Sequence, residues 1–267
     1  MLLTKKGILK IVLMAMCYVL LGTLCVVLSL VFKNMGFPVD FLMIIGIVLY
    51  VLCVLMVLWG RFAEGKGIIM GLGNKLVREE LKPAEFLREY EKVKNADDLV
   101  INKPSVEILQ PVMIAYDILD DRENALATAN EMIAGSQGAK KTLATLFKTS
   151  LLFSYGQTEE AEALFVEVQK QKLNYMCNVL VDGIFKGDRA IAIGDYSTAE
   201  TYLLKLLEST RPKSDNLTKL LAHYQLGEVY KKLEEPDKAI VHYRYCAEFG
   251  GETAIKNSAM EKLQQIK

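Results

Sequence analysis

The feature that most constrains the fold is a pattern of small residues that recurs through the second half of the chain. It is marked by four alanines, Ala125, Ala161, Ala199 and Ala239, which are separated by 36, 38 and 40 residues. A larger apolar residue follows one helical turn later in the last three copies, at Phe165, Leu203 and Tyr243. Self-similarity at this period is typical of stacked helical hairpins.

Helix packing explains why small and large residues alternate in this way. A small residue early in the second helix of a hairpin lets the first helix approach, and a large apolar residue one turn later fills the space beside it. Gly156 and Gly194 lie five residues before two of the alanines, where a tight turn needs positive φ. One hairpin cannot bury its apolar face alone, so neighbouring hairpins must stack. The pattern therefore predicts an all-α fold.

The best copy is "LGEVYKKLEEPDKAIVHYRYC", residues 226–246. Its spacing of Leu226, Gly227, Tyr230, Ala239 and Tyr243 resembles the tetratricopeptide repeat, W-x₂-L-G-x₂-Y…A-x₃-F…P. The resemblance implies an α-solenoid of about four helix pairs with a capping helix. Residue 223 is His where the family has Trp, and residue 251 is Gly near the family's Pro.

Three earlier copies keep fewer of these positions. The third has Gly187 and Ala199 but Ala190 at the Tyr position, the second has Ala161 and Phe165, and the first has Tyr116 and Ala125. Pro111 falls in the first helix of the first copy and predicts a late start or a kink. The resemblance covers about residues 105–251. The spacings exceed 34 residues, so helical hairpins of another repeat family remain an alternative.

In tetratricopeptide repeats the first helices of successive hairpins line a concave groove that holds peptides. By resemblance, the groove here presents Gln110, Ile114, Asp117, Leu146, Ser150, Phe153, Ile184, Asp188, Ile191, Tyr224, Glu228 and Lys231. The Lys, Asn and Arg clamp with which some members grip a C-terminal carboxylate has no match at these positions. A helix or an extended apolar peptide is the expected ligand. The alternative is that these residues, Phe153 and Ile184 above all, pack inside the domain.

Two charge-free apolar runs, Ile11–Phe32 and Phe41–Trp59, precede the repeats. As helices they are about 33 and 28 Å long, near the ~30 Å thickness of a bilayer core. The eight residues 33–40 between them permit only an antiparallel hairpin, so residues 1–60 are predicted to form a transmembrane hairpin. A cleaved signal peptide is the alternative for the first run, but that run is longer than the usual signal core and a second run follows.

Basic residues predict the orientation of this hairpin. Lys5, Lys6 and Lys10 precede the first span, whereas the turn between the spans has only Lys33. Arg61, Lys66, Lys75 and Arg78 follow the second span. The positive-inside rule then places both termini and the repeat domain in the cytoplasm. Such a compact two-span hairpin suggests a bacterial plasma membrane.

The remaining segments complete the predicted domain organisation. Residues 61–104 are expected to be a juxtamembrane linker and helix. Residues 60–74 hold five glycines and favour a flexible connector, with a weak helix as the alternative. A helix is predicted from Pro83 to Lys94, since Pro suits the first helical position. Residues 105–267 form the predicted repeat domain, and residues 254–267 its capping helix.

The sequence has no pattern typical of an enzyme or of a metal or cofactor site. It contains two histidines, no metal-ligand spacing, no phosphate-binding loop and no nucleophile elbow. Residues 1–60 hold four of the 32 basic and one of the 32 acidic residues, so the rest is mildly acidic and gives no electrostatic case for nucleic acid. The odd number of cysteines, five, argues against a disulfide scaffold and for a reducing compartment.

Three functions fit these observations. The leading hypothesis is a non-catalytic, membrane-anchored adaptor that binds a protein or peptide partner. The second is a subunit or assembly factor of a larger membrane complex, with the spans forming the contact through small residues such as Gly22, Ser29 and Gly46. The third, which needs the inverted topology, is an extracytoplasmic helper in secretion or envelope folding.

Overall fold

A computed structural model describes residues 22–24, 27–35, 48, 51, 65–95, 105–170, 186–209 and 215–266. The chain divides into two compact units: Met1–Gly65 with Ala96–Ile101, and Lys66–Asn95 with Asn102–Lys267. Every element of regular structure in the described ranges is helical, as the all-α prediction requires.

The predicted spans 11–32 and 41–59 lie largely outside the described residues. Residues 22–24 and 27–34 of unit 1 are helical. The helices that the structure does describe include none with the length and apolar character needed to cross a membrane. Ile184 of the predicted groove also falls outside the described ranges.

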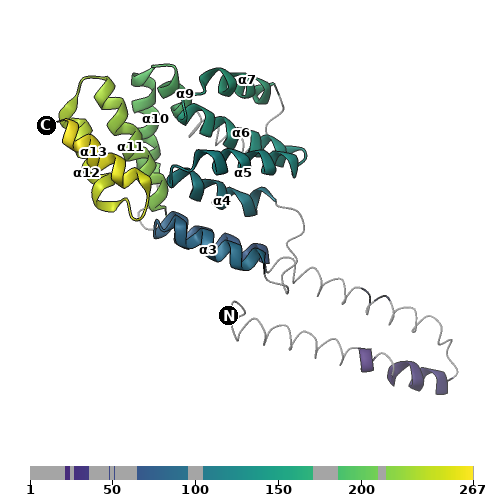
Figure 1. Ribbon diagram of the computed structural model, residues 1–267. Coiled ribbons are helices and arrows are strands. Elements are labelled where there is room, and N and C mark those ends of the chain that lie inside the picture. Colours follow the sequence, from purple (N-terminus) through teal and green to yellow (C-terminus); the bar gives the residue numbers. More distant parts are fainter. Residues whose placement is uncertain are drawn as a thin grey trace. The chain divides into compact units, whose positions relative to one another are not determined.

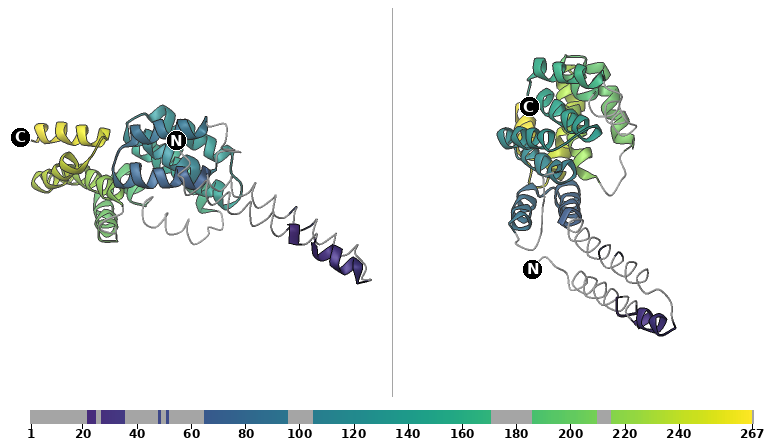
Figure 2. Two further views of the ribbon diagram at one scale, coloured as in Figure 1. Left: turned by 90° about the horizontal axis from the view of Figure 1, so that it is seen from below. Right: turned by 90° about the vertical axis from the view of Figure 1, so that its right-hand side faces the viewer.

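Unit 2 is an array of helical hairpins followed by a last helix (Figures 1 and 2). The hairpins pair η1 with α3, α4 with α5, α6 with α7, α9 with α10, and α11 with α12. The helices are η1 (Gly73–Glu79), α3 (Pro83–Lys94), α4 (Val106–Ile118), α5 (Arg122–Ala134), α6 (Ala139–Ser154), α7 (Thr158–Gln169), α9 (Lys186–Ala192), α10 (Tyr196–Ser209), α11 (Asn216–Lys232), α12 (Pro236–Phe249) and α13 (Ala254–Gln265).

Four hairpins share the same turn. A left-handed residue ends each first helix, with φ of 61° at Asp120, 76° at Gly156, 81° at Gly194 and 60° at Glu234. The next residue donates its backbone N–H to the carbonyl five positions back; Asp121 to Tyr116, at 2.9 Å, is one example. This is the Schellman arrangement, which satisfies carbonyls left free at a helix end. The turns are therefore spaced by 36, 38 and 40 residues, like the alanines of the sequence pattern.

The four alanines lie five residues after these turns, and each is fully buried at 0 % exposure. The residue one helical turn further on is also buried in every case, from Ala129 at 0 % to Phe165 and Leu203 at 3 %. In the last hairpin a Cβ on Gly227 would lie 2.6 Å from the Tyr243 ring. The small residues of the pattern are thus where helices meet most closely, as helix-packing geometry requires.

A fifth hairpin lies where the sequence favoured a connector. Residues 65–72 are α-helical and continue into the π-helical segment η1. Leu81 takes the left-handed turn position at φ 55°, and Phe86, five residues later, is buried in the place of the alanine. Glycine does not prevent the helix here, because Gly73 packs so closely that its Cβ would lie 2.6 Å from Pro111. Tertiary packing outweighs the weak helix propensity of the segment.

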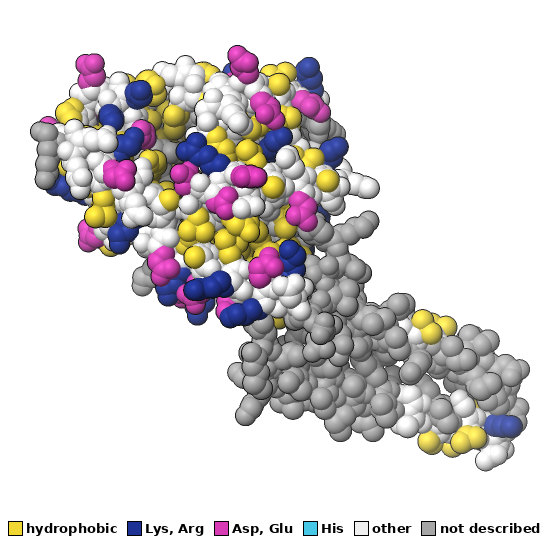
Figure 3. Space-filling model, in the orientation of Figure 1, with side chains coloured by type: hydrophobic (Ala, Val, Ile, Leu, Met, Phe, Trp, Pro, Cys, Tyr) yellow, Lys and Arg dark blue, Asp and Glu magenta, His cyan; other side chains and the backbone are white. Residues whose placement is uncertain are grey.

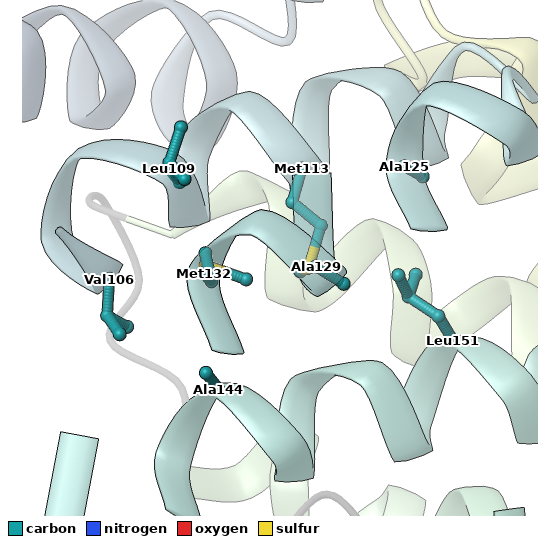
Figure 4. Close-up of a cluster of buried hydrophobic side chains, with 8 residues drawn as sticks. All are labelled: Val106, Leu109, Met113, Ala125, Ala129, Met132, Ala144 and Leu151. Carbon is teal, nitrogen blue, oxygen red and sulfur yellow. The ribbon is translucent and has the colours of Figure 1, made fainter. Parts of the chain in front are cut away.

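Pro111 does not delay α4, contrary to the late start that the sequence allowed. The helix begins at Val106 and contains Pro111 in its interior. A cluster of buried hydrophobic side chains includes three residues of this helix (Figure 4). It joins α4, α5 and α6 through Val106, Leu109, Met113, Ala125, Ala129, Met132, Ala144 and Leu151.

The η1–α3 hairpin, the first in chain order, also contacts a helix far along the chain. Segment η1 packs against α11, and Arg78 forms an ion pair with Asp215 at 3.3 Å. Asn216 donates a hydrogen bond to the Glu79 carbonyl at 2.7 Å, and the backbone N–H of Glu252 donates to the Leu81 carbonyl at 2.9 Å. Unlike a solenoid whose units contact only their neighbours, unit 2 closes its beginning onto α11 and the turn before α13.

Candidate functional site

A cavity of about 500 Å³ lies among the hairpins of unit 2, and we call it the groove cavity. Four of the predicted groove residues line it: Asp117 of α4, Ile191 of α9, and Tyr224 and Glu228 of α11. These residues come from the first helices of three hairpins. The structure thus brings together, in one hollow, residues separated by more than 100 positions in sequence.

The other residues that line the groove cavity were not among those singled out in the sequence. They are Asp120 and Arg122 at the α4–α5 turn, Ser154 at the end of α6, Tyr196 at the start of α10, Lys232 at the end of α11, and Ala254, Ile255 and Ser258 of α13. Most lie at turns or helix ends, where the hairpin pattern could have indicated them. The contribution of α13 has no such signal, because this helix lies beyond the last repeat.

The remaining predicted residues lie elsewhere. Leu146 and Phe153 are buried in the core, at 0 % and 4 % exposure, and the Phe153 ring meets Phe165 edge-on at 6.4 Å between centroids. Gln110 and Ile114 line a second, smaller cavity of about 130 Å³ between η1 and α4. Lys231 is exposed on α11 and does not line the groove cavity.

Ser150 and Asp188 belong to a buried polar connection between three first helices. The Ser150 hydroxyl of α6 donates to Oδ2 of Asp188 on α9, and Gln225 of α11 donates to Oδ1 at 2.8 Å. Asp188 is 7 % exposed, and burial raises its pKa against the lowering effect of these two hydrogen bonds. Both carboxylate oxygens are therefore occupied, which fits a role in joining the hairpins.

Asp117 is the most unusual group at the groove cavity. The Tyr155 hydroxyl donates to its Oδ1 at 2.7 Å. Burial raises the pKa of this carboxyl to about 6; the Tyr155 hydrogen bond opposes the rise, and the negative charges of Asp188 and Asp120 add to it. A strongly shifted carboxyl in a cavity is a common property of functional sites.

The other charged groups of the cavity are mostly paired. Arg122 donates from Nε to Asp120 at 2.9 Å and lies over the Tyr155 ring, 5.1 Å from its centroid. Glu228 accepts hydrogen bonds from the Tyr243 hydroxyl at 2.6 Å and from Lys262 at 2.8 Å. Lys232 is exposed. Tyr224 and Ser258 share a hydrogen bond of 2.7 Å across the α11–α13 side.

The two histidines lie next to each other, away from the groove cavity. His223 of α11 and His242 of α12 share a hydrogen bond between their Nδ1 atoms at 2.8 Å. His223 stacks on Tyr245 at 3.8 Å, and His242 stacks on Tyr230 at 5.4 Å. Burial, together with His242 and Lys219, lowers the pKa of His223 to about 4. Within the described residues, no group of three or more His, Cys, Asp or Glu side chains could hold a metal ion.

The surface around these groups is of mixed charge. Figure 3 shows Lys and Arg side chains next to Asp and Glu side chains over one face of unit 2, with hydrophobic patches between them. We compared the chain with models of protein families, with curated proteins and with solved structures, and none of these matches it. Any functional proposal therefore depends on the geometry of this chain.

Proposed function

We propose that this protein is a membrane-anchored adaptor whose helical-repeat domain, a tetratricopeptide-like α-solenoid, binds a peptide segment of a protein partner. The observation that supports this most is the groove cavity, because the first helices of four hairpins, α4, α6, α9 and α11, and the last helix α13 contribute to it. A hollow of about 500 Å³ has the size of a ligand site, and its walls combine five charged side chains and two serines with two tyrosines and three aliphatic side chains.

The proposed ligand is a helical or extended segment that inserts one or two side chains into the groove cavity. Ile191, Tyr196, Tyr224 and Ile255 supply apolar and aromatic surface, and Ser154 and Ser258 supply hydroxyl groups. Such walls suit a peptide whose apolar side chains are buried and whose backbone is hydrogen-bonded. Binding without catalysis is the proposed activity, with no cofactor.

The proposed anchor is the hairpin of residues 1–60 in a bacterial plasma membrane. Apolar side chains in its described part are exposed: Leu24 at 57 %, Val27 at 55 %, Leu30 at 59 % and Val51 at 49 %. Exposed apolar surface of this kind is unfavourable in water and is removed from water in lipid. The basic residues on either side of the hairpin support a cytoplasmic repeat domain.

Affinity purification of the full chain from detergent-solubilised membranes tests the adaptor function. Ser154→Trp should fill the groove cavity and lose the partner, because Ser154 is exposed there and its hydroxyl bonds only its own helix. Val241→Trp is the matched control, since Val241 of α12 is 61 % exposed and does not line the cavity.

Equal recovery of the partner by both variants would contradict the groove as the binding site. Recovery of membrane proteins alone, unchanged in a chain that lacks residues 75–267, would favour a subunit of a membrane complex.

A further inference from the structure

Three carboxylates line the groove cavity, and Asp117 is the one without an ion-pair partner among the described residues, since Asp120 pairs with Arg122 and Glu228 with Lys262. Asp117 accepts one hydrogen bond, from the neutral Tyr155 hydroxyl to Oδ1. Among the described residues, no other side chain donates to this carboxylate at hydrogen-bond distance. Its neighbour Asp188, by contrast, receives a donor on each oxygen.

The charges around Asp117 leave an excess of negative potential. Asp120 and Arg122 form a pair at 2.9 Å, and Glu228 and Lys262 form another at 2.8 Å, so these four charges largely cancel. Asp117 and Asp188 remain, and the negative charge of Asp188 acts unfavourably on Asp117. Lys232, which is exposed at the end of α11, is the one other cation that lines the cavity among the described residues, so the balance stays negative. A cation placed at Asp117 would relieve this interaction, and its attraction would be strong because the site is poorly solvated.

The walls of the cavity suit the stem of a long basic side chain. Ile191, Ile255 and Tyr224 line the cavity together with Asp117. The methylene groups of Lys or Arg pack on apolar and aromatic surface while the charged end reaches a carboxylate. Arg122 also lines the cavity and its charge lowers the pKa of Asp117, but its guanidinium contacts Asp120 and the Tyr155 ring and makes no ion pair with Asp117.

From these contacts we infer that Asp117 is a subsite for a cationic side chain, Arg or Lys, of the peptide that occupies the groove cavity. This inference depends on the proposed peptide-binding function and adds the chemistry of the ligand. The guanidinium or ammonium group donates to the open oxygen of Asp117, and Tyr155 keeps the carboxylate oriented.

Binding of synthetic peptide pools to the full chain in detergent micelles tests the subsite. The pools are capped pentapeptides with all residues allowed at the flanking positions and arginine, citrulline or glutamate fixed at the centre. Citrulline has nearly the shape of arginine without its charge. We expect the arginine pool to bind at least ten-fold more tightly than the citrulline pool, as a buried charge-assisted contact is worth about 1.5–3 kcal/mol.

Two variants make the test specific. Asp117→Asn should abolish the preference for arginine, because the amide oxygen still accepts from Tyr155 but the charge is gone. Glu248→Gln should preserve it, because Glu248 of α12 is exposed and does not line the cavity. The arginine preference should also strengthen about ten-fold from pH 5 to pH 7 as Asp117 ionises, and this pH dependence should vanish in Asp117→Asn.

Equal binding of the arginine and citrulline pools, or an arginine preference that survives Asp117→Asn, would overturn the subsite but not the proposed peptide-binding function of the groove cavity. If no arginine pool binds although Ser154→Trp still abolishes capture of the natural partner, the subsite is wrong and the adaptor function is right.

Discussion

At the scale of single residues, left-handed positions occupied by glycine in some turns hold larger residues in others. Glu234 has φ 60° and Gly194 has φ 81° in equivalent turns. A residue with a Cβ is strained in this conformation by about 1 kcal/mol relative to glycine. The repeat turn is therefore tolerated without glycine, at the cost of some stability.

We predict that Glu234→Gly stabilises the protein by up to about 1 kcal/mol, because it removes this strain. Gly194→Ala should destabilise it by a similar amount, since it introduces the same strain in an equivalent turn. Urea unfolding of the full chain in detergent, followed by helical circular dichroism, measures both changes. Destabilisation by both variants would show that the two turns are not equivalent.

The histidine pair predicts a pH dependence of stability. The pKa of His223 is lowered to about 4 in the folded protein, whereas a free imidazole titrates near 6.5. Between these values the unfolded chain binds more protons, so the pair's contribution to stability is full above pH 6.5 and is lost as the pH falls towards 4. The loss is about 1–3 kcal/mol, discounted because both rings are partly exposed.

His223→Phe should flatten this dependence, since phenylalanine can stack on Tyr245 without taking a proton. Asp117 has a raised pKa, so its effect on the pH dependence of stability is opposite to that of His223. Its contribution to stability is present when it is protonated and is lost as the pH rises through 6. Comparing the variant with the parent protein removes this shared effect. If the free energy of unfolding had the same slope against pH between 4 and 7 in the variant and the parent, His223 would not be the source of the pH dependence.

At the scale of elements, the same repeat position makes two different contacts. Gly227 on α11 faces the Tyr243 ring, where a Cβ would approach to 2.6 Å. Gly187 on α9 faces Tyr202, and there a Cβ would lie at 3.7 Å, an ordinary contact. Of these two glycines, Gly227 is thus sterically required, whereas Gly187 is not.

We predict that Gly227→Ala destabilises the protein by about 1–3 kcal/mol, because α11 and α12 must separate or Tyr243 must move and weaken its bond to Glu228. Gly187→Ala, the matched control, should be neutral or slightly stabilising. Urea unfolding measures both. A neutral Gly227→Ala would mean that the α11–α12 contact is looser than described.

The array of hairpins was predictable from sequence where small residues mark the closest helix contacts. The pattern at Ala125, Ala161, Ala199 and Ala239 correctly indicated four hairpins, and the tail was correctly expected to be helical. Helix α3 was predicted with its observed bounds, Pro83–Lys94, but its pairing with η1 was missed. Phe86 replaces the alanine and Leu81 replaces a turn glycine, so no residue type signals the repeat. Its helical state comes from packing against Pro111 and α11.

The groove cavity was predictable only in part. The repeat register places Asp117, Ile191, Tyr224 and Glu228 on first helices, and these residues do line the cavity. Register alone does not distinguish a residue that faces a hollow from one that packs in the core, as Leu146 and Phe153 do. Nor does it show that residues of α13 line the cavity, because that depends on the direction of the chain after the last hairpin.

At the scale of unit 2 as a whole, the contact between η1 and α11 joins the beginning of the hairpin array to its last hairpin. The Arg78–Asp215 pair is partly buried, with about a third of each side chain exposed, at 33 % and 28 %. We predict that Arg78→Ala speeds amide hydrogen exchange in residues 65–95 by up to about five-fold, as a partly exposed ion pair contributes up to ~1 kcal/mol. Exposed Arg88 on α3 gives the control, Arg88→Ala. Identical exchange in both variants would show that this pair does not hold the ends together.

The account as a whole depends on the groove cavity being where a partner binds. The most direct measurement is photocrosslinking in native membranes from amino acids installed at Ser154 and Lys232, on the cavity, and at Val241, outside it. We expect one protein to be captured from both cavity positions and not from Val241, with the crosslink mapping to a short segment of that protein. Crosslinks confined to this chain itself, or the same products from all three positions, would contradict a peptide-binding groove.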